Sequence, residues 1–252
     1  MKTRTLVGKN AGITGASRGL GLSIAEALAE AGARVALVAR DRQRLRAATE
    51  QLSSRDLAVE SLVADVKRET EVNAMADAVA SRFGKVQILV NNAGINLRQP
   101  LAEFTLAEWQ EVLDTNLTGA FLVTRALLPH MRGQGYGRII NLTSMMSHVA
   151  LPQRTAYCAS KFGLLGLTRA LALELAPERI TVNGISPGPF ATEINRPLLA
   201  SAELSQWFVS RIPLGRWGES RDIGQLALYL CSEAAGFITG ADIVIDGGWT
   251  AQ

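Results

Sequence analysis

Residues 11–21 decide the fold, and they read Ala11-Gly12-Ile13-Thr14-Gly15-Ala16-Ser17-Arg18-Gly19-Leu20-Gly21. The apolar start predicts a β-strand, and the three glycines after it allow a tight turn that a ligand can approach without meeting a Cβ. A helix that begins after such a turn offers free N–H groups and the positive end of its dipole to a phosphate. The stretch therefore predicts the strand, turn and helix of a dinucleotide site, the alternative being a plain glycine-rich turn.

Short apolar runs alternate with helical patterns along the rest of the chain. Strands are predicted at 11–14, 34–39, 58–63, 88–91, 138–143, 180–185 and 242–245, and helices at 19–31, 42–53, 69–83, 106–131, 155–176 and 221–231. This alternation predicts an α/β fold with one doubly wound parallel sheet of about seven strands and helices on both faces, of the Rossmann type. We expect a single domain over 1–252, with the ligand beyond the carboxyl ends of the strands, where the strand order reverses.

Composition excludes several classes of function. A net charge of +3 over 252 residues, with acids and bases interleaved, does not predict a nucleic-acid surface. The chain start has only a brief apolar stretch, and the most apolar helix is too short to span a bilayer, so we expect no signal peptide, no membrane association and a cytoplasmic location. Cys158 and Cys231 are expected to stay reduced. The two histidines are isolated from other ligands, so no metal site is predicted.

The end of the second predicted strand bears on the choice of cofactor. Ala39 is neutral where an NAD-specific site usually has an acid, and Arg40 follows it, while Arg18 stands in the glycine loop. Two guanidinium groups suit a 2′-phosphate, so NADP is predicted in preference to NAD. Asp41 supports the competing interpretation, exclusion of the phosphate, but we expect it to cap the next helix.

The next two strand ends offer further cofactor contacts. Asp65 and Val66 follow the third strand, and Asn92, Ala93 and Gly94 follow the fourth. The small residues would let the backbone approach the cofactor closely. Each segment is equally consistent with an ordinary turn.

Tyr157 and Lys161 are four residues apart, and Ser144 lies upstream of them. Residues at this spacing share one face of a helix, so the ammonium and the phenol point into the same space. We expect the ammonium to lower the pKa of the phenol, which would make Tyr157 a proton donor and acceptor near neutral pH. A surface pair on an amphipathic helix is the alternative.

These segments, taken together, resemble the short-chain dehydrogenases/reductases over essentially the full length of the chain. The matching residues are the loop at 14–21, Asp65-Val66, Asn91-Asn92-Ala93-Gly94, Asp114-Thr115-Asn116-Leu117, Ser144, Tyr157 with Lys161, and Pro187-Gly188 followed by Thr192. The resemblance implies a catalytic tetrad of Asn116, Ser144, Tyr157 and Lys161. The cofactor residues expected from the motifs and the resemblance are Gly15, Ser17, Arg18, Gly19, Leu20, Gly21, Arg40, Asp65, Val66, Asn92, Ala93, Gly94, Tyr157, Lys161, Pro187, Gly188 and Thr192.

The resemblance also implies a role for each member of the tetrad. Tyr157 would exchange a proton with the substrate oxygen, and Ser144 would polarise the carbonyl. Lys161 would bind the nicotinamide ribose, and Asn116 would anchor a water that links Lys161 to solvent. A homotetramer is implied as well, with the helices at 106–131 and 155–176 at its interface, although ordinary packing on the sheet explains their apolar residues equally well.

The substrate is expected to be chosen by the segment at 188–212, which is predicted to form a mobile helical lid. Local features resemble the gluconate 5-dehydrogenase branch, among them Ile95 to Arg98, the Met145-Met146 pair and Arg216-Trp217-Gly218. Arg98, His148, Gln153 and Arg154 could supply donors to a hydroxylated or carboxylated substrate, although residues of this kind are more often solvated loop residues.

The sequence thus predicts an NADP(H)-dependent oxidoreductase that interconverts a ketone and a secondary alcohol, acting on a small polyol, keto-sugar acid or similar compound. One alternative is a 3-oxoacyl-carrier-protein reductase, for which Arg125, Arg132 and Arg138 would form a basic docking patch. The other is a non-catalytic, cofactor-sensing protein of the same fold, which usually lacks the tyrosine or the lysine that this chain retains.

Overall fold

Seven parallel strands form one sheet in the order β3-β2-β1-β4-β5-β6-β7 in the computed structural model, which describes residues 4–252. The strands are β1 (Asn10–Thr14), β2 (Arg34–Ala39), β3 (Val59–Val63), β4 (Ile88–Asn91), β5 (Gly137–Leu142), β6 (Ile180–Pro187) and β7 (Asp242–Ile245). Each predicted strand is present, with its ends shifted by no more than two residues. The prediction of a doubly wound parallel sheet is confirmed.

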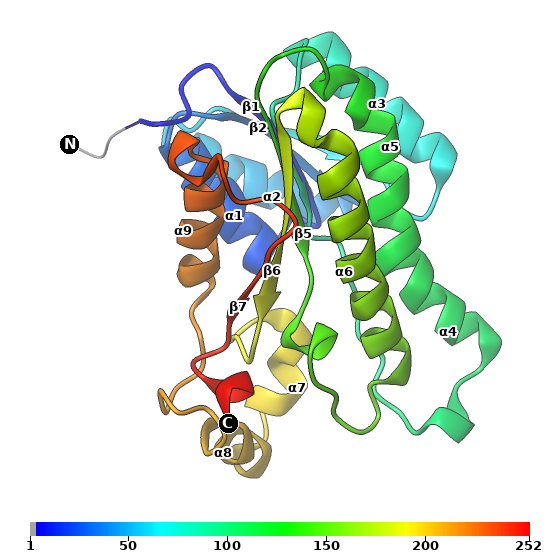
Figure 1. Cartoon of the computed structure of the whole chain (residues 1–252). Helices are drawn as coiled ribbons and strands as arrows, with labels where there is room; N and C mark the ends of the chain where they lie inside the picture. Colours follow the sequence, from blue (N-terminus) through cyan, green and yellow to red (C-terminus); the bar gives the residue numbers. More distant parts are fainter. Residues whose placement is uncertain (1–3) are drawn as a thin grey trace.

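Helices cover both faces of the sheet (Figure 1). On one face lie α1 (Gly19–Glu30), α2 (Arg42–Ser53) and α9 (Ser220–Cys231), and on the other lie α3 (Glu69–Phe83), α5 (Gly119–Met131) and α6 (Thr155–Leu175). Because successive residues of a strand point to opposite faces, Ile13 joins the core under α1 and α9 while Leu89 joins the core under α3 and α5. The inner parts of β2 and β4 accordingly consist almost entirely of buried apolar residues.

The strand order reverses between β1 and β4. Strand β1 pairs with β2 on one side and with β4 on the other, so the chain crosses over the sheet after β3. At this point the connections from β1 and β4 leave the sheet in opposite directions and open a crevice at its carboxyl edge. The ligand position expected from the sequence is therefore present in the fold.

The predicted helix at 106–131 is interrupted. It consists of α4 (Leu106–Leu113), a π-helical turn (Asp114–Thr118) and α5. The Thr115 hydroxyl donates a 2.8 Å hydrogen bond to the Glu111 carbonyl, and the side chain of Asn116 bonds outside the helix. Single π-turns inside α-helices are frequent at functional sites, so the interruption marks Asn116 for attention.

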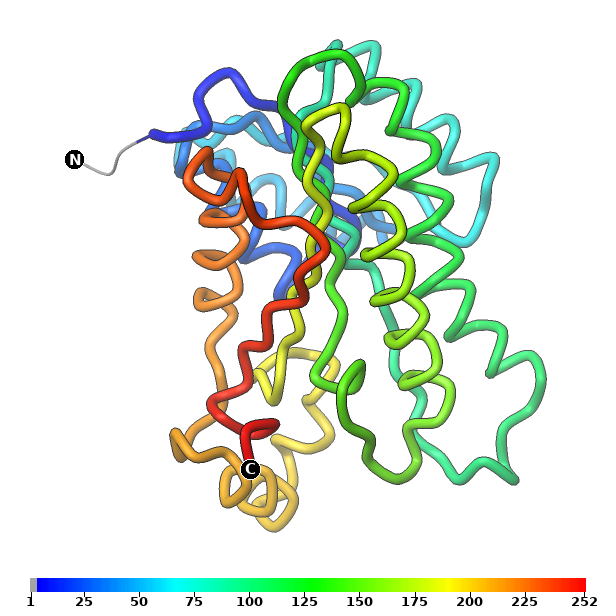
Figure 2. Tube along the Cα trace, in the orientation of Figure 1, coloured from blue at the N-terminus to red at the C-terminus, as the bar shows by residue number. Residues whose placement is uncertain are grey.

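The segment at 188–212 is helical, as predicted. It contains a 3₁₀ turn (Glu193–Asn195), α7 (Arg196–Leu199) and α8 (Ala202–Val209), and it lies beyond the carboxyl end of β6 (Figure 1). The C-terminal end of the chain lies beside it (Figure 2). Trp249 packs there against Trp207 and Phe208, with ring centroids 6.0 and 5.6 Å apart. No helix within residues 4–252 combines the length and the hydropathy needed to cross a membrane.

Candidate active site

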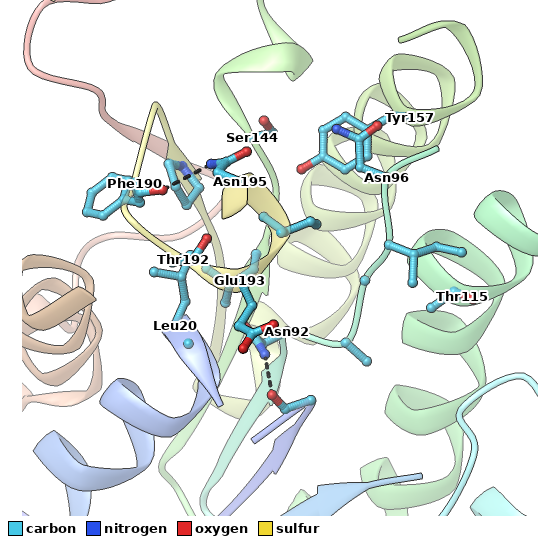
Figure 3. Close-up of a pocket in the computed structure, with 18 of the residues that line it drawn as sticks. Leu20, Asn92, Asn96, Thr115, Ser144, Tyr157, Phe190, Thr192, Glu193 and Asn195 are labelled. Atoms are coloured by element: carbon cyan, nitrogen blue, oxygen red, sulfur yellow. Dashed lines mark hydrogen bonds between the residues drawn. The ribbon is translucent and has the colours of Figure 1, made fainter. Parts of the chain in front are cut away.

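A cavity of about 720 Å³ opens at the carboxyl edge of the sheet. It is lined by every residue predicted to contact the cofactor except Gly21, and by every member of the predicted tetrad except Asn116. Figure 3 shows Ser144, Tyr157 and Asn96 toward one end of this cavity, and Leu20 and Asn92 toward the other. Segments that are far apart in the sequence therefore converge on one space.

The glycine loop is shaped by its neighbours. Gly15 and Gly19 have φ angles of +65° and +57°, which other residues adopt rarely. A Cβ on Gly21 would lie 2.3 Å from Asn92 Nδ2 and 2.6 Å from the Gly15 carbonyl oxygen, so this glycine packs beneath the loop. Asn92 Nδ2 donates hydrogen bonds of 2.9 and 3.1 Å to the carbonyl oxygens of Thr14 and Gly15 (Figure 3). The loop is thereby held open above the N-terminus of α1, where a phosphate is favoured.

The end of β2 is positively charged. Asp41 Oδ1 accepts a 3.0 Å hydrogen bond from the Arg44 amide, so Asp41 caps α2 as predicted, and Arg44 Nε lies 3.2 Å from Asp41 Oδ2. Arg40 is exposed and lies 3.8 Å from Glu111, while Arg18 pairs with Glu193 of the segment at 188–212 at 3.0 Å. Three guanidinium groups thus border this end of the cavity.

Arg44 was missed by sequence reasoning. It lines the cavity together with Arg18 and Arg40. The sequence does contain a pattern that could have identified Arg44, because Arg40, Arg42 and Arg44 alternate around the predicted helix cap.

Asp65 and Val66 line the cavity. Asp65 Oδ1 accepts a 3.1 Å hydrogen bond from the Lys67 amide, and the Asp65 amide donates to Glu71 at 2.9 Å. Val66 is buried against the start of α5, where a Cβ on Gly119 would lie 2.7 Å from it. Both residues are fixed in place by local contacts.

Asn116 lies behind the cavity wall. Its Nδ2 donates hydrogen bonds of 2.9 Å to the Ile95 carbonyl and 3.0 Å to Ser160 Oγ, and its Oδ1 accepts a 2.8 Å bond from the Ile95 amide. Both ends of the side chain are therefore engaged with the protein. In this structure Asn116 holds the segment after Gly94 in place.

Ser144 and Tyr157 face each other at one end of the cavity. The Ser144 oxygen accepts a 3.1 Å hydrogen bond from the Met146 amide, so its own hydroxyl hydrogen is available to the Tyr157 phenol. Burial raises the pKa of the Tyr157 phenol, and a hydrogen bond with Ser144 lowers it in part. The prediction of a lowered pKa is therefore wrong, because loss of contact with water outweighs the nearby positive charges of Arg98 and Arg154.

Lys161 is buried below Tyr157. Its Nζ donates a 2.5 Å hydrogen bond to the Leu142 carbonyl and lies 5.6 Å from the centroid of the Tyr157 ring. Burial lowers the pKa of Lys161 to about 8, and the negative charge of Asp242 opposes that change. A lysine in this setting changes its charge close to physiological pH.

Two arginines stand on the wall near Tyr157. Arg98 Nη2 donates to the Ile194 carbonyl at 3.0 Å and to Asn195 Oδ1 at 2.8 Å, while its buried Nε has no partner in residues 4–252. Burial lowers the pKa of Arg98, and it lowers that of Arg154 to about 10, with a further contribution from Arg98. Neither guanidinium has a carboxylate within 4.0 Å among the described residues.

Two other donors predicted for the substrate lie elsewhere. Gln153 is exposed and does not line the cavity. His148 also lies outside it, because its Nε2 bonds the Asp242 carboxylate at 2.7 Å. Asn195 and Asp242 were missed, since each depends on contacts between segments far apart in the sequence.

The predicted basic patch for a carrier protein is not formed. Arg125 pairs with Glu69, and Arg132 Nε lies 2.9 Å from Glu178 Oε1. Arg138 is buried and bonds the carbonyl groups of Gly137 and Ser232. Within residues 4–252 no three His, Cys, Asp or Glu side chains are grouped as metal ligands would be.

Comparison with known proteins identifies close relatives of the whole chain. Residues 15–250 match the family model described as enoyl-(acyl carrier protein) reductase. The chain is 37% identical over 251 residues to gluconate 5-dehydrogenase of Gluconobacter oxydans, with 98% of this chain and 97% of that protein covered. It is 40% identical over 247 residues to D-threitol dehydrogenase of Mycolicibacterium smegmatis, with 98% and 95% covered. A solved structure of gluconate 5-dehydrogenase from Burkholderia cenocepacia, in complex with NADP and tartrate, superposes with a TM-score of 0.94 at 37% identity, covering 99% of this chain and 98% of that one.

Proposed function

Because the chain belongs to the short-chain dehydrogenase/reductase family, we propose that it is an NADP(H)-dependent oxidoreductase that interconverts a keto-sugar acid, or a related polyol ketone, with its secondary alcohol. The family model and the relatives cover nearly the whole chain, so the fold and the oxidoreductase class apply to all of it. Beyond the fold and the class of enzyme, we propose the roles of the four tetrad residues, the cofactor contacts and the substrate.

One observation carries the substrate class. Arg98 and Arg154 stand on the cavity wall beside Tyr157, the first partly buried and the second buried, and neither has a carboxylate partner among the described residues. Holding two such cations together is unfavourable unless an anion joins them. A substrate carboxylate would bind both through charge-assisted hydrogen bonds. Its carbonyl would then face the phenol of Tyr157.

The chain's own residues supply the proton chemistry. A bound nicotinamide supplies the hydride. Tyr157 donates its phenolic proton to the carbonyl oxygen, and Ser144, whose oxygen is held by the Met146 amide, donates a hydrogen bond to the same oxygen. Lys161 places a positive charge under the ring and stabilises the phenolate that forms. Asn116 keeps the wall at Ile95 in place.

The cradle fits a dinucleotide that carries a 2′-phosphate. The uncapped N-terminus of α1 and the glycine loop would take the pyrophosphate. Arg18, Arg40 and Arg44 border the place where a ribose phosphate would lie, and the carboxylate of Asp41 is engaged by the start of α2. NADP is therefore the proposed cofactor. The remaining cofactor contacts that we propose are those predicted from the sequence, namely Asp65, Val66, Asn92, Ala93, Gly94, Tyr157, Lys161, Pro187, Gly188 and Thr192.

We further propose that the segment at 188–212 acts as a lid and that the protein is a cytoplasmic homotetramer. Thr192, Glu193 and Phe208 of this segment line the cavity. Phe121 of α5 and Leu173 of α6 are 43% and 79% exposed, which suits an interface along these helices. The free cysteines Cys158 and Cys231 suit a reducing compartment. Light scattering of the purified protein gives the subunit number, and a monomer would contradict the assembly.

A substrate panel tests the function. We expect 5-ketogluconate to be reduced with NADPH at a kcat/KM about tenfold or more above that of an uncharged ketose and of an acetoacetyl thioester, and above its own value with NADH. Preference for the thioester would indicate the carrier-protein reductase instead. No turnover of any ketone would indicate the non-catalytic alternative.

Two variants test the arginine pair directly. Arg98→Gln and Arg154→Gln should each raise KM for 5-ketogluconate by about 10–100-fold and change kcat/KM for the uncharged ketose by less than about threefold. Arg221→Gln, an exposed arginine on α9, is the matched control and should change neither. Equal losses on both substrates would contradict carboxylate recognition.

A further inference from the structure

A buried carboxylate lies directly behind the catalytic serine. Asp242 begins β7, and its side chain is 2% exposed. Its Oδ1 lies 2.6 Å from Thr143 Oγ1, and its Oδ2 lies 2.7 Å from both Ser186 Oγ and His148 Nε2. Space is made for it by Gly184, where a Cβ would lie 2.2 Å from Asp242 Oδ1.

The group is connected to the main chain of Ser144. Ser186 Oγ lies 2.9 Å from the Ser144 carbonyl oxygen, and Thr143 is the residue before Ser144. Thr143 Oγ1 also lies 2.7 Å from the Ile185 carbonyl oxygen. The two hydroxyl hydrogens are thus shared between the carboxylate and main-chain carbonyl groups. The carboxylate therefore governs how β5, β6 and β7 are tied together at the point where Ser144 leaves the sheet.

The same carboxylate acts on the catalytic lysine. Lys161 is 4% exposed, and Asp242 is the group whose charge favours its ammonium form against burial. His148 and Lys161 are the basic side chains that interact with Asp242 within residues 4–252, His148 from the turn after Ser147 and Lys161 from α6. Two parts of the catalytic centre consequently depend on one side chain that never reaches the cavity.

We propose that Asp242 and His148 form a positioning pair for the catalytic centre: the carboxylate fixes the Ser144 segment through Thr143 and Ser186 and places a negative charge near the Lys161 ammonium, while His148 holds that carboxylate in orientation. The proposal rests on the proposed function, because it assigns these residues to the same reaction. Asp242 and His148 contact neither substrate nor cofactor and act only through Ser144 and Lys161.

Asp242→Asn tests the charge while keeping the shape. With NADPH and the best ketone of the panel, kcat should fall about tenfold, with KM and the affinity for NADPH within about threefold of wild type. The upper pH limit of kcat/KM should move to lower pH by about one unit, because the Lys161 ammonium loses the charge that favours it. Asp77→Asn, an exposed carboxylate on α3, is the matched control and should leave all three values unchanged.

His148 gives a second test that does not disturb the buried carboxylate, since its side chain is 31% exposed. His148→Ala should lower kcat about threefold or more, and His148→Gln, which can still donate to Asp242 Oδ2, should restore most of it. His130→Gln, at the chain's only other histidine, is the control. If Asp242→Asn does not fold, the comparison of His148→Ala with His148→Gln tests the proposal in its place.

Wild-type kcat and an unmoved pH limit in Asp242→Asn would overturn the proposal, as would equal activities in His148→Ala and His148→Gln. A change confined to the melting temperature would do the same, because it would assign the pair to the fold alone. The activity of the wild-type enzyme tests the proposed function independently of the variants. If wild type reduces none of the ketones, the proposed function fails, whereas loss of the variants' effects in an active wild type removes only the positioning pair.

Discussion

The ammonium nitrogen of Lys161 lies 5.6 Å from the centroid of the Tyr157 ring. It is held there by a 2.5 Å hydrogen bond to the carbonyl oxygen of Leu142, the last residue of β5. The sheet itself therefore sets the distance between the two side chains, before any cofactor binds. Small errors in such a distance are expensive in catalysis, which explains why the lysine is anchored to a strand.

The charge of Lys161 should set the upper pH limit of the reaction. Its pKa is lowered to about 8, whereas that of Tyr157 is raised by burial, so the lysine loses its proton first as the pH rises. We expect kcat/KM for ketone reduction to fall above about pH 8, because a neutral amine no longer stabilises the phenolate. A pH profile of the wild-type enzyme measures this, and a profile flat to pH 10 would contradict it.

Removing the same ammonium should stabilise the fold. The pKa of Lys161 is about 8 in the folded protein and near 10.5 when unfolded, so the unfolded state holds this proton more tightly and the buried charge costs stability below pH 8. Lys161→Met should therefore raise the free energy of unfolding at pH 7 by about 1–3 kcal/mol while abolishing activity. Urea unfolding at pH 7 and at pH 10 measures the effect. The gain should shrink at pH 10, where the wild-type lysine is neutral, and a lower stability at pH 7 would refute the assignment.

Tyr157→Phe should remove the proton donor and little else. Because the phenol oxygen faces Ser144 and the cavity, we expect kcat to fall by about 10²–10⁴-fold with NADPH affinity nearly unchanged. Single-turnover reduction with NADPH separates chemistry from binding. Undiminished reduction would end the assignment of Tyr157 as the proton donor. Tyr229→Phe, on the exposed surface of α9, is the control.

What could be predicted from the sequence depended on contacts that are local or carried by a motif. The strands, the glycine loop and the cap at Asp41 follow from short-range patterns, and all are present. The sequence gives no sign that Asp242 meets His148, since 94 residues separate them. The two residues meet only because the folded sheet places Asp242, at the start of β7, close to the ends of β5 and β6.

The structure also differs from the sequence predictions in how charged side chains are paired and buried. Arg125 and Arg132 look like a docking patch in the sequence, but each finds a carboxylate on a neighbouring element once the chain folds. The pKa of Tyr157 was misjudged because spacing on a helix gives the positive neighbour but not the degree of burial. Asn116 lies in the π-turn and bonds Ile95 and Ser160, contacts that no local pattern in the sequence reports.

The packing of Gly21 predicts a severe effect from one methyl group. A Cβ there would lie 2.3 Å from Asn92 Nδ2 and 2.6 Å from the Gly15 carbonyl oxygen, so the loop and its anchor must separate. We expect Gly21→Ala to lower the free energy of unfolding by about 1–3 kcal/mol and to weaken NADPH binding at least about tenfold. Gly166→Ala on α6 has no atom within 4 Å of the added Cβ and should instead stabilise by about 0.5–1 kcal/mol. Thermal melting and fluorescence titration compare them, and equal behaviour of the two variants would contradict the close packing of Gly21.

The arginines at the end of β2 predict a specific change in cofactor preference. Arg18 and Arg40 have only exposed partners, Glu193 and Glu111, so they can turn to a 2′-phosphate at little cost. We expect Arg18→Ser combined with Arg40→Ser to lower kcat/KM for NADPH by about 10–100-fold and to change the value for NADH by less than about threefold, since NADH lacks the phosphate. Arg42→Ser, an exposed arginine in the same basic run, should affect neither cofactor. If NADH and NADPH lose equally, these arginines support the loop and do not read the phosphate, and Arg44 alone would then remain as its partner.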